Sequence, residues 1–150
     1  MEKLSTVLVC GSRYGDGTPD GRIVARGLRE WIRLYGSIHH LVTGGRDPQS
    51  VDGLAHAFAL SAGIMTTAVP ALWGRYGDAA GPMRNRRMLE LFDVAAVLAF
   101  PGGHGTADMI ALAEAVGIPV WQWNALRSEP AWELRSKPVF GVQLVLPLAV

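Results

Sequence analysis

The feature that most constrains this chain is a regular alternation of apolar, β-branched runs with helical stretches. Most of the runs end at glycine or proline, and the connections between segments are short. Such alternation predicts parallel strands joined by right-handed helical crossovers. We therefore predict an α/β, Rossmann-like, doubly wound fold whose mainly parallel sheet has five or more strands and helices on both faces. The expected strands are Leu4–Cys10, Ile38–Thr43, Ile64–Val69, Val94–Phe100 and Ile118–Trp121, and the expected helices are Gly21–Tyr35, Val51–Ala62, Pro82–Phe92 and Thr106–Val116.

A length of 150 residues is the usual size of one domain. We expect a single domain over residues 1–150, with its core in residues 4–121 and a C-terminal extension in residues 122–150. Within the extension, Trp132–Lys137 is expected as a short helical turn and Val139–Leu146 as an edge strand.

Composition excludes several classes of protein. Charged residues make up 18% of the chain and the net charge is +1, which argues against a disordered chain and against a basic duplex-binding protein. The lone Cys10 has no partner for an internal disulfide, so we expect a reducing, cytoplasmic location and a buried thiol. No signal peptide, membrane span or metal-ligand spacing is recognisable, and we expect no metal and no cofactor.

Glycines and small polar residues follow three of the expected strands. In a doubly wound sheet these strand ends open toward the same edge, where ligands of this architecture bind at a topological switch point. We therefore expect the three loops to line one ligand site. They are Gly11-Ser12-Arg13, Thr43-Gly44-Gly45-Arg46 and Pro101-Gly102-Gly103-His104-Gly105-Thr106.

The third loop is the most informative because it joins a strand to a helix. Glycines let the backbone approach a ligand closely, and free N–H groups at a helix start attract a phosphate. Thr106 adds a hydroxyl donor to the amides from Gly103 onward. The alternative is a tight turn that merely needs glycine, and the convergence of three loops favours phosphate binding.

The helix before the fourth strand carries three arginines. Asn85 falls on its buried stripe, and we expect it to hydrogen-bond a neighbouring loop or a ligand. Arg84 and Arg86 lie on opposite shoulders of that stripe, and either can neutralise a phosphate. The alternative for Arg86 is a surface pair with Glu90, and Arg87 is expected in solvent.

Two acidic residues and one tryptophan have two interpretations each. Asp52 can bond a ribose hydroxyl or can serve in N-terminal helix capping. Asp108 in the first turn after Gly105 has the same alternatives. Trp73 can stack on a base or cover the site, or can be an ordinary core residue.

Taken together, these segments resemble the SLOG superfamily, and the nearest branch is similar to the YspA/YpsA-related group, frequent in bacteria and their phages. The resemblance spans roughly Leu4 to Val120. It rests on the glycine loops, on Val51-Asp52-Gly53-Leu54-Ala55, on Gly81-Pro82-Met83-Arg84-Asn85-Arg86-Arg87-Met88 and on Pro101-Gly102-Gly103-His104-Gly105-Thr106-Ala107-Asp108.

The resemblance implies a nucleotide-derived ligand. The superfamily includes the LOG enzymes, which cleave the N-glycosidic bond of nucleoside 5′-monophosphates. Their arginine position corresponds to Arg86, and their catalytic glutamate position falls on Met109, which is no carboxylate. A LOG-like enzyme would therefore need Arg86 with Asp108 or Asp52 in the glutamate's place.

Our first expectation is a module that senses or sequesters a nucleotide or nucleotide-sugar phosphate. The alternative is a LOG-like phosphoribohydrolase. Single-stranded DNA handling, as in the DprA relatives of the superfamily, requires an extended basic surface that the charge of +1 does not favour. The apolar C-terminal segment and the resemblance favour a homodimer.

Overall fold

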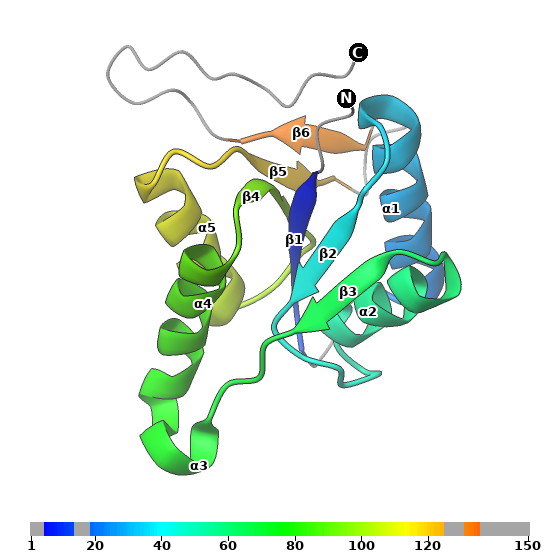
Figure 1. Cartoon of the computed structure of the whole chain (residues 1–150). Coiled ribbons are helices and arrows are strands. Elements are labelled where there is room, and N and C mark those ends of the chain that lie inside the picture. Colours follow the sequence, from blue (N-terminus) through cyan, green and yellow to red (C-terminus); the bar gives the residue numbers. More distant parts are fainter. Residues whose placement is uncertain (1–4, 14–18, 125–130, 136–150) are drawn as a thin grey trace.

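A computed structural model of the chain describes residues 5–13, 19–124 and 131–135. Six strands form one sheet in the order β3-β2-β1-β4-β5-β6 (Figure 1). The strands pair in parallel from β3 through β5, and β6 pairs antiparallel to β5. This is the Rossmann-like α/β arrangement that the sequence predicts. In chain order the elements are β1 (Thr6–Cys10), α1 (Gly21–Tyr35), β2 (His40–Thr43), α2 (Val51–Ser61), β3 (Met65–Ala68), α3 (Trp73–Tyr76), η1 (Gly77–Ala79), α4 (Ala80–Leu91), β4 (Val94–Ala99), α5 (His104–Ala115), β5 (Val120–Trp123) and β6 (Trp132–Leu134).

Helices cover both faces of the sheet, as predicted. Alternate residues of β1 point to opposite faces, so Val7 and Val9 join the core under α1 and α2 while Leu8 and Cys10 join the core under α4 and α5. Figure 1 shows the two helix pairs on opposite sides of the strands. Because both faces are covered, the central strands are apolar throughout their length.

The expected ends of α1 are confirmed. The carboxylate of Asp20 accepts hydrogen bonds from the backbone amides of Arg22 and Ile23, which have no partner within the helix. At the other end, Gly36 adopts a φ of 98°, a left-handed conformation that side-chain-bearing residues rarely take. The helix therefore begins and ends where the sequence predicts.

Other boundaries differ from the prediction. The segment expected as a loop before the third predicted helix contains α3 and η1, and α4 begins at Ala80, not at Pro82. Likewise, α5 begins at His104 within the glycine loop, not at Thr106. The first turn of a helix needs no intrahelical amide bonds, so glycine and proline are accepted there more readily than in a helix interior.

The start of the C-terminal extension is a strand, so the expected helical turn over Trp132–Lys137 is wrong for Trp132–Leu134. Trp132 is buried, and its indole N–H donates to the carbonyl of Gly27 in α1 at 2.8 Å. Its ring also contacts the rings of Trp31 and Trp123. Tertiary packing therefore determines this edge strand. The expected strand Val139–Leu146 lies outside the described residues.

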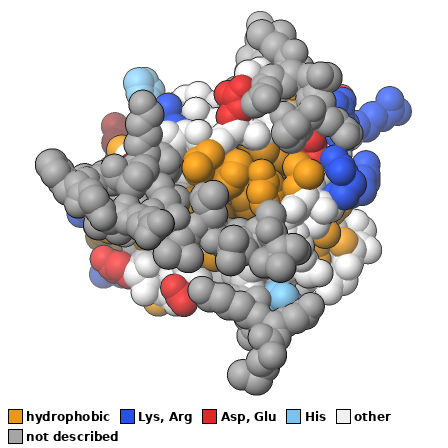
Figure 2. Space-filling model, turned by 90° about the horizontal axis from the view of Figure 1, so that it is seen from above, with side chains coloured by type: hydrophobic (Ala, Val, Ile, Leu, Met, Phe, Trp, Pro, Cys, Tyr) orange, Lys and Arg blue, Asp and Glu red, His pale blue; other side chains and the backbone are white. Residues whose placement is uncertain are grey.

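Charge and apolar surface are both unevenly distributed on the face seen from above. Hydrophobic side chains gather in the middle of it, and Lys and Arg side chains lie mostly at one side (Figure 2). Among the described residues, no helix combines the length and the apolar character that crossing a bilayer requires.

Candidate functional site

The glycine loops after β1 and β4 meet at the carboxyl edge of the sheet. Ser12 donates its backbone N–H to the carbonyl of Pro101 at 2.9 Å, and the carbonyl of Ser12 accepts from Val51 at the start of α2 at 3.0 Å. The chain runs from β1 toward β2 and from β4 toward β5, in opposite directions across the sheet. The loops therefore flank the topological switch point between β1 and β4, where ligands of this fold class bind.

Three of the glycines allow the loops to approach their neighbours closely. A Cβ on Gly11 would lie 2.7 Å from Cβ of Val51. A Cβ on Gly44 would overlap the guanidinium of Arg84, and one on Gly102 would overlap the hydroxyl of Thr106. A side chain at Gly11 or Gly102 would force these loops away from their neighbours, and one at Gly44 would displace the guanidinium of Arg84.

A pocket of about 570 Å³ lies between these loops and the start of α4. Its volume suits a small molecule of nucleotide size. The structure brings together most residues of the site predicted from the sequence. Lining residues are Val9, Cys10, Gly11, Ser12, Arg13, Gly44, Asp52, Trp73, Asp78, Gly81, Pro82, Arg84, Asn85, Met88, Gly103, His104, Gly105, Thr106 and Asp108.

The first turn of α5 contributes backbone donors to this pocket. No side chain caps the helix at Gly103. Within the described part of the chain, the amides of His104, Gly105 and Thr106 donate to no protein acceptor, whereas Ala107 already bonds the carbonyl of Gly103 at 3.0 Å. Free amides of this kind, together with the positive end of the helix dipole, form an anion site.

Arg84 contributes a positively charged, half-buried side chain. Its Nη1 donates to the carbonyl of Gly44 at 2.5 Å, and its Nε donates to Oδ1 of Asn85 at 2.9 Å. Burial lowers the pKa of Arg84 from its ordinary value, and the neighbouring Asp52 opposes that shift. Because arginine keeps its proton in proteins, the guanidinium is a fixed positive charge at the wall of the pocket.

Asp52 is the acidic residue of the pocket with the most unusual surroundings. Its side chain is 8% exposed, and its Oδ1 lacks a hydrogen-bond partner among the described residues. Burial raises its pKa to about 6, although Arg84 and Arg13 act in the opposite direction. The helix cap is Ser50, whose hydroxyl accepts from the amide of Gly53 at 2.9 Å. The side-chain cap of α2 is therefore supplied by Ser50, and Asp52 faces the pocket.

Asn85 fastens the glycine loop to α4, as its position on the buried stripe of the helix predicts. Its side-chain amide donates to the carbonyl of Gly105 at 3.1 Å and to Oδ2 of Asp108 at 2.9 Å. Asn85 is buried and Asp108 is half-buried. Asp108 is thereby held at the pocket wall by a neighbour on a different helix.

Four predicted site residues do not line this pocket. Arg86 is exposed on α4, and the pocket contacts the preceding arginine, Arg84, instead. Gly45 lies outside the lining, and Pro101 and Gly102 line a second cavity. The resemblance to the LOG enzymes pointed to Arg86, whereas the pocket lies on the side of the helix that carries Arg84.

Several lining residues were absent from the predicted site. Gly81 and Pro82 contribute because α4 begins two residues earlier than expected. Asp78 comes from the segment expected to be an irregular loop. Trp73 comes from the same segment, and of its two expected roles the one at the site agrees with its place in the lining. The only sequence signal for these residues was the aromatic and glycine content of that segment.

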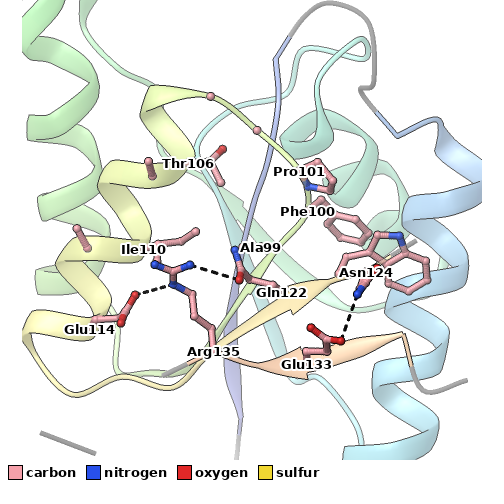
Figure 3. A pocket seen from close by; sticks show the side chains of 15 residues that line it. Ala99, Phe100, Pro101, Thr106, Ile110, Glu114, Gln122, Asn124, Glu133 and Arg135 are labelled. Atoms are coloured by element: carbon pink, nitrogen blue, oxygen red, sulfur yellow. Dashed lines mark hydrogen bonds and ion pairs between the residues drawn. The ribbon is translucent and has the colours of Figure 1, made fainter. Parts of the chain in front are cut away.

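The second cavity, of about 670 Å³, lies on the other side of the loop that follows β4 (Figure 3). Arg135, directly after β6, bonds Glu114 of α5 at 2.9 Å and Gln122 of β5 at 3.5 Å. Asn124 donates to Glu133 at 3.2 Å. These five polar side chains thus pair with one another at the cavity, which makes it a weaker candidate than the first pocket.

No protein-family model and no curated protein matches this chain. Among solved structures it is similar to TM1055, a structural-genomics target determined by X-ray crystallography. The TM-score is 0.59 and the identity is 23%, over 78% of this chain and 72% of that one. The likeness supports the architecture derived above: the chain has a Rossmann-like α/β fold.

Proposed function

We propose that the chain binds the phosphate of a nucleotide or nucleotide-sugar in the pocket between β1, β4 and the start of α4. The phosphate is held by the free amides of His104, Gly105 and Thr106. Arg84 neutralises its charge from the opposite wall. The observation that carries this proposal is the uncapped first turn of α5 facing a pocket with a half-buried arginine.

The remaining walls suit the rest of such a ligand. Gly11, Ser12 and Gly44 line the pocket, and at the two glycines no side chain separates the backbone from a bound sugar. Asp52 has an unpartnered carboxylate oxygen that can accept from a ribose hydroxyl. Many of the residues shared with the SLOG pattern line the same pocket, among them Gly11, Gly44 and Arg84, although Arg86 does not, and on this basis we propose that the chain is a SLOG-like module.

The matched pair Arg84 and Arg86 tests the phosphate proposal. Calorimetry would measure the Kd of 5′-ribonucleoside monophosphates for Arg84→Ala and Arg86→Ala, with Arg86→Ala as the control on the same helix. We expect Arg84→Ala to weaken binding at least about tenfold, because it removes a charge-assisted contact. Equal effects of the two substitutions, or no binding of any monophosphate to the unsubstituted chain, would refute the proposal.

A second candidate function is cleavage of the N-glycosidic bond, and Asp52 is the observation that favours it. In that reaction water replaces the base on C1 of the ribose, and the products are free base and ribose 5-phosphate. A carboxylate beside the ribose stabilises its positive charge and accepts a proton from water. Asp108 is held by Asn85, whereas Asp52 has an unpartnered oxygen and a pKa of about 6.

Chromatography of free base after incubation with each nucleoside monophosphate separates the two functions. A hydrolase releases base, and Asp52→Asn abolishes the release while nucleotide binding persists. If the unsubstituted chain binds a monophosphate and returns it intact, the module only binds, and the hydrolase candidate fails.

A further inference from the structure

Trp73 differs from the other tryptophans of the chain. The chain has five tryptophans, and all of them lie in the described residues. Four of these, Trp31, Trp121, Trp123 and Trp132, are between 2% and 7% exposed in the core, whereas Trp73 is 41% exposed. A single exposed aromatic side chain needs no special explanation, so the surroundings of Trp73 decide what its ring can do.

The surroundings of Trp73 place that surface at the site. The indole lines the pocket and comes from α3, which η1 joins to α4. Its edge lies over Gly81, where an added Cβ would be 3.0 Å from Cη2 of the ring. The missing side chain of Gly81 leaves room for this edge of the indole against α4.

The guanidinium of Arg13 covers the face of Trp73. Its central carbon is 4.7 Å from the ring centroid, and Arg13 comes from the loop after β1, on the far side of the pocket. Both groups are exposed, so the pair is a weak cation–π contact at the pocket mouth. A planar cation thus occupies the position in which a flat ring would stack, and a base can enter between the two groups only when the exposed Arg13 side chain swings away from the indole.

We propose that Trp73 and Arg13 form a clamp for the nucleobase of the ligand, with the base stacked on the indole and the guanidinium against its other face. Aromatic rings and arginine planes both stack on bases, and such stacking tolerates different bases. The clamp favours ligands that carry a planar ring over sugar phosphates that lack one. The location of the clamp rests on the proposed phosphate site, but different residues supply its contribution to the binding free energy.

Tryptophan fluorescence provides a direct readout of stacking. Because the other tryptophans are buried, a base that stacks in the pocket should quench the emission of Trp73 alone. Titration with the four 5′-ribonucleoside monophosphates should quench the unsubstituted chain and leave Trp73→Leu unchanged. Quenching of equal size in Trp73→Leu would overturn the clamp.

Calorimetry separates the clamp from the phosphate site. The ligands are the four monophosphates, the corresponding nucleosides and ribose 5-phosphate, and the variants are Trp73→Leu, Trp73→Phe and the control Tyr76→Leu. Tyr76 shares α3 with Trp73 and does not line the pocket. We expect Trp73→Leu to weaken the binding of monophosphates about tenfold or more and to leave the Kd of ribose 5-phosphate unchanged. Trp73→Phe should restore the binding of monophosphates.

The outcomes distinguish the two proposals. If ribose 5-phosphate binds as tightly as the monophosphates, or if Trp73→Leu weakens both equally, the clamp is wrong and the phosphate site stands. If nucleosides bind through Trp73 and phosphate adds nothing, the clamp stands and the phosphate site is wrong. If no ligand binds the unsubstituted chain, both are wrong.

Discussion

Asn85 of α4 donates a 2.9 Å hydrogen bond to Asp108 of α5, and with the same amide group it bonds the carbonyl of Gly105. One buried side chain thus joins the two helices of one face at the point where the glycine loop becomes helix. The position of the proposed anion site therefore depends on α4 as much as on the loop itself.

Replacing Asn85 by leucine should destabilise the fold. The substitution keeps the branching of the side chain but leaves the carbonyl of Gly105 and the carboxylate of Asp108 without their donor, at a cost of about 1–3 kcal/mol. Urea unfolding checks the change in the free energy of unfolding. Asp108→Ala is the matched control, since it removes the hydrogen bond between Asn85 and Asp108 and leaves the one to Gly105. A loss of stability as large as that of Asn85→Leu would contradict this interpretation.

Asp52 should make stability depend on pH. Its folded-state pKa of about 6 exceeds the ordinary 3.8, so the folded chain binds a proton more readily than the unfolded chain. Below pH ~4 the group favours neither state. Between pH ~4 and ~6 the free energy of unfolding falls as pH rises, by up to about 3 kcal/mol from this residue.

The measurement is urea unfolding from pH 4 to pH 7 for the unsubstituted chain and Asp52→Asn. The asparagine variant cannot ionise, so the difference between the two chains should increase with pH in its favour. A constant difference over that range would show that the carboxyl titrates normally in the folded state.

Gly102 and Gly103 should differ sharply in their tolerance of alanine. A methyl group on Gly102 would overlap Thr106 and lie 2.9 Å from the carbonyl carbon of Gly11, so Gly102→Ala should separate the two loops. Gly103 has open space and a negative φ, so Gly103→Ala should fold normally. Thermal unfolding compares the two variants, and equal Tm values would mean that the loops do not depend on this close approach.

Trp132 should contribute as much to stability as a central core residue, although it lies on the edge strand. It is buried, bonds Gly27 and packs on other aromatic rings, so Trp132→Ala should cost about 3–5 kcal/mol. Trp132→Phe keeps most of the packing and loses the hydrogen bond. Its free energy of unfolding should therefore fall less than that of Trp132→Ala, and it serves as the comparison. A loss below about 1 kcal/mol for the alanine variant would show that β6 is dispensable.

Local signals in the sequence were enough to predict most of the fold. The apolar alternation located the five parallel strands, and Asp20 and Gly36 marked the ends of α1 because capping depends on neighbouring residues only. Trp132–Leu134 could not be predicted in this way, because its strand conformation comes from pairing with β5 and contact with α1. Long-range packing leaves no periodic trace in a segment of three residues.

The same division applies to the candidate site. Its glycine loops could be predicted from local signals, whereas the residues whose role depends on tertiary structure could not. Glycines after strands identified the loops, since close approach demands a missing side chain. To choose between Arg84 and Arg86, one must know from which side the loop of Gly44 approaches α4. That side is set by tertiary structure and has no local signal in the sequence. Trp73 was recognised only as ambiguous, because nothing nearby in the chain indicates that its ring is exposed.

The walls built from Gly11, Gly44 and the first turn of α5 present peptide atoms to a ligand. Every residue type carries the same peptide atoms, so substitution of a side chain leaves most of the hydrogen-bonding groups on this surface in place. Relatives could therefore keep the capacity to hold an anion while their side chains diverge beyond recognition, and resemblance at this edge would survive in backbone shape after it had faded from the sequence.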